Sequence, residues 1–469
     1  MATATTTSER GQWSSRTGFI LAAAGSAIGL GNIWKFPFEV ADGGGASFVL
    51  MYLLFCFLLC FPVMVTEIAI GRKTQKNPVG AFDALGFSRW RFIGLLGVIS
   101  GVLILSFYNV VAGWALGYVV ELVSGNFAIG SEFGTFIASV AKIAVYSILF
   151  MVTTAFIVSG GVSSGIERAA RILMPTLLAI VVGLVIYSLT LPNALDGLAF
   201  YLIPDFSKVT FEVVYNALGQ AFFSLSLGMG ALITYGSYLS KKENIVGAAA
   251  AITLADVGIA FIAGLLMFPL VGYINGGDMS NVVGGPGLIF TVLPEAFASM
   301  GAVAGLVVGT AFFVLLSFAA LTSTVSLLEV PTAFVIDEFK MPRRTAALII
   351  ATVVFVIGLP SLLANGASPF FSGFITYVGD GTATSFMDFV EDVSSDTFLP
   401  LGGMMIVSFA AYVWKKHNLS EELAVGNPSY KGSNTERFIN FSISYVCPTV
   451  LGIIFVLTVL DLYLGVSFF

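Results

Sequence analysis

The chain has 469 residues, of which 57% are hydrophobic and 10% charged, with a net charge of −6. A soluble domain carries about 25% charged residues, so this composition excludes an ordinary soluble protein and predicts a polytopic membrane protein. The three cysteines, Cys56, Cys60 and Cys447, lie in apolar segments, and the one histidine, His417, lies in a polar loop; no disulfide or metal framework is visible. We do not interpret the polar N-terminal segment as a cleavable signal peptide.

Runs of about 20 apolar residues predict membrane-spanning helices. In chain order we expect eleven, at 17–40, 46–71, 91–123, 137–159, 166–190, 210–239, 246–274, 302–338, 343–364, 384–414 and 435–466. We divide the chain into a cytoplasmic segment (1–16), a first repeat of five helices (17–190), a second repeat with extracellular loops (191–434) and a last helix (435–469).

The basic residues predict the orientation of these helices. Most of them fall in segments that lie on one side of the membrane if there are eleven spans, and only Lys35, Lys142 and Lys208 fall elsewhere. The opposite side collects acidic residues. We therefore expect a plasma-membrane protein, in a bacterial inner membrane, with its N-terminus in the cytoplasm.

The first predicted span contains a break. Gly25, Gly29 and Gly31 lie in its middle and are followed by Asn32. Each glycine costs about 1 kcal/mol relative to alanine inside a helix. Unpaired backbone groups are tolerated at membrane depth only beside protein or a polar cavity. Transporters use such broken helices to hold substrates and cations.

The sixth predicted span repeats this pattern at 224–230, with the sequence SLSLGMG. The two interrupted helices are five apart, so they cross the membrane in opposite directions and predict an inverted repeat of five plus five helices. For either break alone, close helix packing through small residues is the competing interpretation.

Oxygen-bearing side chains interrupt several apolar runs. Asn32 lies at the first break, Ser224 at the second, Asp256 within the seventh span, and Thr322 and Ser323 within the eighth. Carbonyl, hydroxyl and carboxylate oxygens are the ligands of hard cations. The competing interpretations are a structural hydrogen bond for the carboxylate and bonds back to their own helix for the hydroxyls.

Two further polar residues favour structural roles when judged from spacing alone. Glu67 lies near the end of its helix, and we expect it to bridge to the unwound backbone of a neighbouring helix. Tyr108 is either a core aromatic or a hydroxyl that faces the cavity, and spacing favours the core.

Taken together, these segments resemble the neurotransmitter:sodium symporter family, which includes bacterial transporters of leucine and of hydrophobic amino acids. The matching segments are Trp13, GSAIGLGNIWKFP at 25–37, DGGGAS at 42–47, TEIAIGR at 66–72, Tyr108, GQAFFSLSLGMG at 219–230, ITYGSY at 233–238, ALTS at 320–323 and DEF at 337–339. The resemblance runs from residue 10 to the C-terminus. It implies an all-α symporter that couples sodium entry to amino acid import by alternating access.

The resemblance also implies two sodium sites. The first would consist of the Ala27 carbonyl, Asn32, Ser224 and Asp256, together with the substrate carboxylate. The second would consist of the carbonyls of Gly25, Ile28 and Ala319 and the hydroxyls of Thr322 and Ser323.

For the substrate, the resemblance implies that Tyr108 and the backbone near Leu30 and Gly31 bind the carboxylate. Ala27 and Ser224 also belong to the implied site, whose side-chain pocket is formed by Ser26, Ile104, Phe223, Ser226, Met229, Ser323 and Leu327. Met229 stands where the leucine transporter has a bulkier aromatic residue. We therefore expect a roomier pocket for hydrophobic or aromatic L-amino acids, unless Met229 merely fills a gap.

Two departures from the family pattern refine the expected function. Gly29 stands where monoamine transporters carry an aspartate, which favours an amino acid substrate. Asp256 stands where chloride-dependent members have an asparagine, close to the residues that match their anion site, Tyr52, Gln220 and Ser224. A fixed carboxylate repels chloride, so we expect chloride independence, and its protonation when sodium leaves would give proton antiport.

The resemblance further implies two gates. Outside, Lys35 would pair with Glu391 or, if the register slips, with Asp388 or Asp392, and Phe223 and Tyr108 would form a lid. Inside, Arg10 would pair with Asp337, packed by Trp13 and Tyr238. The spacing of Gly165 and Pro175 resembles that proposed in the family to let the fifth helix unwind.

Three alternatives are weighed against sodium symport. A proton-coupled or exchanging carrier of the same fold would transport without sodium, and a channel would conduct without saturating. An intramembrane enzyme would need a nucleophile–base pair or a metal set, and His417 and the cysteines provide none. The expected partners are sodium, an amino acid and the lipid bilayer, without nucleic acid, and the expected state is a monomer or weak dimer.

Overall fold

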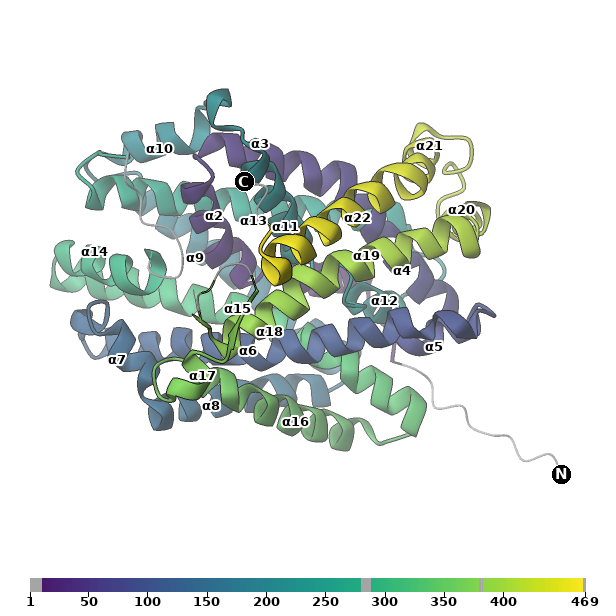
Figure 1. Ribbon diagram of the computed structural model, residues 1–469, viewed down its shortest axis with the longest axis horizontal. Helices are drawn as coiled ribbons and strands as arrows, with labels where there is room; N and C mark the ends of the chain where they lie inside the picture. Colours follow the sequence, from purple (N-terminus) through teal and green to yellow (C-terminus); the bar gives the residue numbers. More distant parts are fainter. Residues whose placement is uncertain (1–10, 280–287, 379–380, 382, 467–469) are drawn as a thin grey trace.

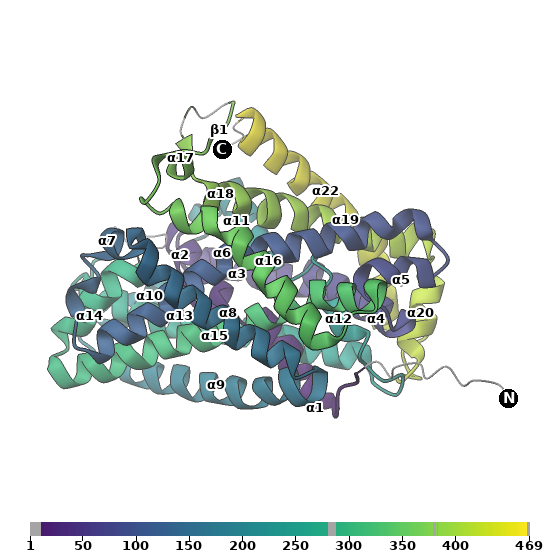
Figure 2. The same cartoon turned by 90° about the horizontal axis from the view of Figure 1, so that it is seen from below.

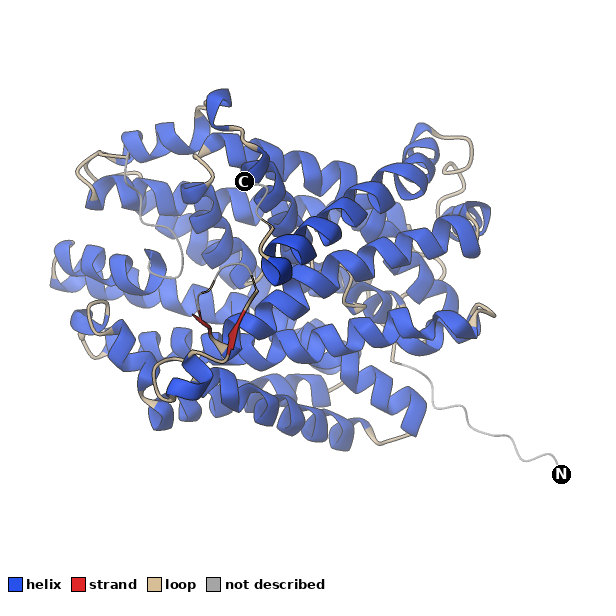
Figure 3. Cartoon of the chain, in the orientation of Figure 1, coloured by secondary structure: helices blue, strands red, loops and turns tan. Residues whose placement is uncertain are grey.

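The computed structural model describes residues 11–279, 288–378, 381 and 383–466 (Figure 1). Almost all of this part of the chain is helical, and a single short hairpin, β1 (Ile375–Thr376) with β2 (Ala383–Thr384), lies in the loop before the tenth span (Figure 3). The prediction of an all-α polytopic membrane protein is therefore confirmed.

The first five spans begin and end close to the predicted positions. They consist of α1 (Arg16–Ala27), η1 (Gly31–Lys35) and α2 (Phe36–Asp42); α3 (Ala46–Phe55), η2 (Cys56–Cys60) and α4 (Phe61–Thr74); α6 (Arg91–Val123); α8 (Val140–Ser159); and η5 (Val162–Glu167) with α9 (Arg168–Ser188). The fourth span is shorter than predicted, because the chain leaves helical geometry at Ser139 after the separate helix α7 (Phe133–Ala138).

The remaining spans follow further along the chain. They consist of α11 (Phe211–Ser224) with α12 (Ala231–Gly236); α13 (Ile245–Ile274); α15 (Ala302–Phe339); α16 (Arg343–Leu363); α18 (Phe386–Glu391), η8 (Asp392–Phe398), α19 (Leu399–Ser408) and η9 (Phe409–Val413); and α21 (Asn434–Phe441), η10 (Ser442–Val446), α22 (Cys447–Thr458) and η11 (Val459–Tyr463).

Shorter helices connect these spans. They are α5 (Pro78–Ala84), η3 (Ser88–Trp90), η4 (Phe127–Ile129), α10 (Ala194–Leu202), η6 (Phe206–Lys208), η7 (Leu288–Val292), α14 (Leu293–Ser299), α17 (Pro369–Ser372) and α20 (Lys416–Ala424). His417 lies in α20, so its expected place in an irregular loop is corrected. The three cysteines are buried and free, as expected from their apolar segments.

Both predicted breaks are present. The halves of the first span, Arg16–Ala27 and Gly31–Asp42, meet at 51°. Nine other helices in the described residues are long and apolar enough to cross a bilayer, and α11 and α12 form the remaining span as two pieces separated by residues 225–230. The interruptions of the first and sixth helices are therefore confirmed, within an all-α bundle that has at least nine apolar spans in the described residues.

Left-handed backbone explains why the sixth helix stops. Ser226, Gly228 and Gly230 all have positive φ angles, of 54°, 82° and 76°. A Cβ at Gly228 would lie 2.3 Å from the carbonyl oxygen of Leu399, so the tenth span approaches this backbone closely. Glycine is the residue that accepts both constraints.

Three long helices pack against α1. They are α9, α13 and α15, and α15 in turn packs along α6 (Figure 2). The last helix, α22, lies at the edge of the bundle against α19 (Figure 2). The two broken helices are thus enclosed by continuous ones, which supply partners for the backbone groups that the breaks release.

Candidate substrate and cation sites

A small cavity of about 20 Å³ lies where the two broken helices meet. Its lining residues come from both breaks, α6 and α15: Ser26, Ala27, Gly29, Gly31, Ile104, Tyr108, Phe223, Ser224, Ser226, Met229, Ser323 and Leu327. Every residue predicted for the substrate site is among them except Leu30. In its place is Gly29, which the sequence argument had treated only as the site of a missing aspartate.

Leu30 participates in the site through its backbone. Its N–H donates to the Tyr108 hydroxyl across 2.8 Å, and both groups are buried. The Gly29 N–H is occupied by the side-chain oxygen of Asn32 at 3.0 Å. Because the tyrosine oxygen accepts from Leu30, its own proton is available for an acceptor in the cavity. The structure therefore corrects the core interpretation of Tyr108, whose side chain faces the cavity.

The opposite part of the cavity is apolar. Ile104, Met229 and Leu327 line it, and the ring of Phe223 covers Gly31 so closely that a Cβ there would lie 3.2 Å from the ring. The cavity thus joins a polar end at the broken backbone to an apolar end, an arrangement that suits an amphiphilic zwitterion.

Asn32, Ser224 and Asp256, predicted for the first sodium site, converge on one point. The Asn32 amide nitrogen donates to Asp256 Oδ1 at 2.8 Å, and the Ser224 hydroxyl donates to Oδ2 at 3.1 Å. The Tyr52 hydroxyl also donates to Oδ2, at 3.2 Å. The carboxylate is completely buried. These neutral donors partly compensate its desolvation. The Asp256 carboxylate and the Ser224 hydroxyl offer oxygens that suit a hard cation, whereas Asn32 presents its amide nitrogen here and its oxygen accepts from the Gly29 N–H.

Residues of the second predicted site also come together. The Thr322 hydroxyl lies 3.2 Å from the Ile28 carbonyl oxygen and 2.9 Å from that of Ala319. A Cβ at Gly25 would lie 3.3 Å from Thr322 Cβ, which places the glycine backbone against the same side chain. Two main-chain carbonyl oxygens and a hydroxyl, with the Gly25 backbone beside them, again suit a hard cation.

Ser323 lies between that group and the substrate cavity. Its hydroxyl reaches the Ser26 carbonyl oxygen at 3.3 Å and lines the cavity. Thr322 also approaches the Phe318 carbonyl oxygen of its own helix at 3.3 Å. The bond back to the same helix and the contact with the first break are therefore both present for Thr322.

At the outer end, Lys35 pairs with Glu391. The ammonium nitrogen lies 3.2 Å from Glu391 Oε1 and 4.9 Å from the centre of the Phe223 ring. The alternative partners are engaged elsewhere: Asp388 accepts from the Ser385 hydroxyl, and Asp392 accepts from Tyr377. Of the three candidate carboxylates, Glu391 is therefore the one that pairs with Lys35.

At the inner end, Trp13 anchors the start of the chain to α12. Its indole nitrogen donates to the Tyr235 carbonyl oxygen at 2.9 Å, and its ring contacts the ring of Tyr238 edge-on. Asp337 accepts from the Asn77 backbone at 2.9 Å. Arg10, the predicted partner of Asp337, lies outside the described residues.

Two buried carboxylates at this end were not singled out from the sequence. Glu329 accepts from the Tyr238 hydroxyl at 2.6 Å and forms an ion pair with Arg343. Glu167 accepts from the backbone and the hydroxyl of Ser14, at 2.7 and 2.6 Å. A charge inside the apolar segment LLEVP was the available signal for Glu329, whereas Glu167 lies in the polar segment between two spans and gives no such signal.

The fifth helix is wound in this structure. Gly165 lies in η5, where a Cβ would come within 2.0 Å of the Ile157 carbonyl oxygen, and Pro175 lies inside α9. Glu67 takes the bridging role expected of it, since its Oε1 accepts from the Gly228 N–H at 2.8 Å. Gln220, unforeseen, donates to the Gly31 carbonyl oxygen at 2.7 Å and so ties the two breaks together.

The fold and this arrangement define a secondary transporter with a central site between two broken helices. The family model described as the sodium:neurotransmitter symporter family matches residues 10–131 and 131–464. The chain belongs to that family, whose members are transporters and not enzymes.

Individual relatives agree. A sodium-dependent transporter of Bacillus subtilis, YhdH, is 35% identical over 95% of this chain and 96% of its own length. A sodium-dependent transporter of Haemophilus influenzae is 32% identical over 96% of this chain and 99% of its own. The crystal structure of MhsT in complex with L-phenylalanine is similar at a TM-score of 0.85 and 42% identity, over 95% of this chain and 99% of that one. The family identity establishes a membrane location and sodium dependence.

Proposed function

We propose that this symporter imports hydrophobic or aromatic L-amino acids together with two sodium ions, and that it does so without chloride. The zwitterionic head of the substrate would lie at the first break, with its carboxylate at the Tyr108 hydroxyl. Its side chain would enter the apolar part lined by Ile104, Met229 and Leu327. The similarity to a transporter crystallised with L-phenylalanine supports this class of substrate.

The observation that carries the proposal is the buried Asp256 carboxylate beside the cavity. The carboxylate accepts hydrogen bonds from the hydroxyls of Ser224 and Tyr52, and these two residues match anion-site residues in chloride-dependent members. The third matching residue, Gln220, donates instead to the Gly31 carbonyl. An anion there would face a fixed negative charge, whereas a sodium ion would gain a carboxylate ligand.

Coupling follows from shared ligands. In the proposed first site the substrate carboxylate completes the coordination of sodium by Ala27, Asn32, Ser224 and Asp256. The bound sodium ion and the bound substrate then each raise the affinity of the protein for the other by the same factor. One charge crossing 100 mV contributes about 2.3 kcal/mol, so two sodium ions can drive roughly thousandfold accumulation.

The gates would act in turn. Phe223 and the Lys35–Glu391 pair would close the outer side over a bound substrate. Trp13, Tyr238 and the proposed Arg10–Asp337 pair would close the inner side. Unwinding of the fifth helix between Gly165 and Pro175 would then admit water to the second sodium site, built from Gly25, Ile28, Ala319, Thr322 and Ser323.

The proposal is tested with purified protein in proteoliposomes. We expect labelled L-phenylalanine to accumulate with an inward sodium gradient, to stop when potassium replaces sodium, and to be unaffected when gluconate replaces chloride. A screen of unlabelled amino acids as competitors then defines the substrate class. Uptake driven by a proton gradient without sodium would instead identify the proton-coupled or exchanging carrier.

A further inference from the structure

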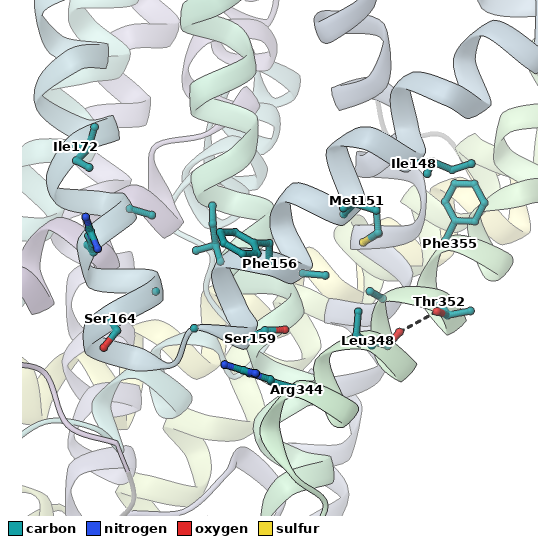
Figure 4. Close-up of a pocket in the computed structure, with 18 residues that line it drawn as sticks. Ile148, Met151, Phe156, Ser159, Ser164, Ile172, Arg344, Leu348, Thr352 and Phe355 are labelled. Carbon is teal, nitrogen blue, oxygen red and sulfur yellow. Dashed lines mark hydrogen bonds between the residues drawn. The ribbon is translucent and has the colours of Figure 1, made fainter.

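A groove of about 960 Å³ lies away from the central site. Three helices form it. The second half of α8, the first turns of α9 and the first half of α16 contribute its walls: Ile148, Met151, Val152, Ala155, Phe156, Ile157, Ser159, Gly160, Ser164, Gly165, Arg168, Ala169, Ile172, Arg344, Leu348, Ala351, Thr352 and Phe355. Figure 4 shows these side chains.

The groove is polar at one end and apolar along its body. Arg168 stands in the first turn of α9 and Arg344 in the first turn of α16, next to Ser159 at the end of α8. In Figure 4 Arg344 extends beneath Ser159 toward Ser164, whereas Phe156, Met151 and Phe355 line the other part. Arg344, Ser159 and Ser164 therefore lie toward one end of the groove, and Arg168 lies on α9 one helical turn before Ile172.

The apolar body opens away from the protein core. Phe156 is 79% exposed, Val152 60%, Ile172 61% and Leu348 59%. On a membrane-spanning protein such side chains face hydrocarbon, so the groove is accessible to acyl chains. The hydroxyl of Thr352, the one polar side chain in its body, is satisfied by the Leu348 carbonyl oxygen of its own helix at 2.8 Å.

The two arginines are available for an external anion. Within the described residues neither Arg168 nor Arg344 forms a salt bridge or side-chain hydrogen bond, whereas the adjacent basic residues Arg171 and Arg343 are paired with Glu167 and Glu329. Both unpaired guanidiniums are exposed. Guanidinium groups bind phosphate oxygens in a bidentate geometry, and basic pockets between spans on the cytoplasmic side bind anionic lipid headgroups.

We propose that this groove binds an anionic phospholipid, with its phosphate headgroup between Arg168 and Arg344 and an acyl chain along Phe156, Ile172 and Leu348. Two features select this occupant. The charge at the end of the groove complements a phosphate, and the length of apolar wall beyond it matches a hydrocarbon chain rather than a soluble ion. The site is separate from the central cavity and does not depend on the proposed substrate.

The test uses a reporter inside the groove. Leu348→Trp is placed in nanodiscs that contain either brominated phosphatidylglycerol or brominated phosphatidylcholine with identical chains, and quenching of tryptophan fluorescence is compared. Val356→Trp, on an exposed position of the same helix outside the groove, is the matched control. We expect preferential quenching by phosphatidylglycerol at Leu348→Trp and equal quenching by both lipids at Val356→Trp.

Charge variants in the Leu348→Trp background identify the headgroup contacts. Each removed arginine should lower the preference for phosphatidylglycerol about fivefold, so that Arg168→Gln with Arg344→Gln abolishes it. Replacing both by lysine should retain most of it. Arg89→Gln with Arg437→Gln removes the same charge from exposed positions elsewhere and should leave the preference unchanged.

Three results would overturn the lipid site. The first is the same quenching ratio with and without Arg168 and Arg344. The second is equal phosphatidylglycerol preference at the control position, which reflects general attraction to the protein surface. The third is loss of the preference in excess inorganic phosphate but not in chloride of equal ionic strength, which would indicate a free-anion site.

Discussion

At the scale of single residues, Asp256 is the proposed determinant of which ions this transporter accepts. Three neutral donors, from Asn32, Ser224 and Tyr52, hold its buried carboxylate. Their number and direction keep the carboxylate fixed without a cationic side chain, so its negative charge remains uncompensated by protein. That deficit is what a sodium ion would correct.

We expect Asp256→Asn to lower the affinity for sodium at least tenfold in chloride-free buffer, since it removes the fixed charge and keeps the shape. Chloride should then restore part of the affinity, because Tyr52 and Ser224 become available to an anion. Sodium titration of L-phenylalanine binding, by scintillation proximity, measures both effects. Asp196→Asn, an exposed position in α10, serves as control. Unchanged sodium titration in Asp256→Asn would refute the site.

At the scale of the elements, side chains from neighbouring segments bind the backbone groups that the two breaks leave free. Glu67 binds the Gly228 N–H, and Gln220 binds the Gly31 carbonyl of the first break. These bonds satisfy groups that the interrupted helices leave unpaired at membrane depth. The bond from Gln220 also links the sixth span to the break in the first span.

We expect Gly228→Ala to destabilise the protein by about 1–3 kcal/mol, because φ is 82° and a Cβ would lie 2.3 Å from the Leu399 carbonyl oxygen. Gly219→Ala, in α11 with nothing within 4 Å, is the matched control and should be neutral or stabilising. Thermal unfolding of both proteins in one detergent measures the difference. Equal melting temperatures would show that the break tolerates an ordinary residue.

The buried ion pair between Glu329 and Arg343 joins α15 to α16. Glu329→Gln removes the charge that Arg343 pairs with in a buried environment, and we expect a loss of about 3 kcal/mol in stability. Arg91→Gln interrupts a pair with Glu338 that is much more exposed, and should cost under about 1 kcal/mol. Thermal unfolding again separates the two, and similar losses in both variants would contradict the buried-pair argument.

At the scale of the whole molecule, the sequence predicted the architecture better than the contacts. Glycine clusters and long apolar runs gave the spans, both breaks and the inverted repeat, because those features depend on local backbone cost and on the bilayer. Glu391 could not be separated from Asp388 and Asp392, since one helical turn carries all three and only packing selects among them. Glu329 was missed, and the contact of Gln220 with Gly31 was not predicted, for the same reason: their partners lie on distant segments.

The outer gate is a property of the whole bundle, because Lys35 and Glu391 belong to the first and tenth spans. We expect Lys35→Gln to release bound L-phenylalanine two- to tenfold faster, since the pair is partly exposed and contributes about 1 kcal/mol. Lys142→Gln, which removes a more exposed pair with Glu121, is the control. Dissociation of labelled substrate after dilution measures the rate. Identical rates in the wild-type and Lys35→Gln proteins would exclude the pair as a gate.

The crowding around Gly29 constrains how this protein could evolve a new substrate. A Cβ there would lie 2.2 Å from the Ser323 hydroxyl oxygen and 2.7 Å from that of Tyr108. An aspartate suited to amines would therefore displace two hydroxyls that belong to the proposed amino acid site. Because both atoms lie at the ends of side chains, they would have to move aside for it. A change from amino acid to amine specificity would thus alter Gly29, Tyr108 and Ser323 together.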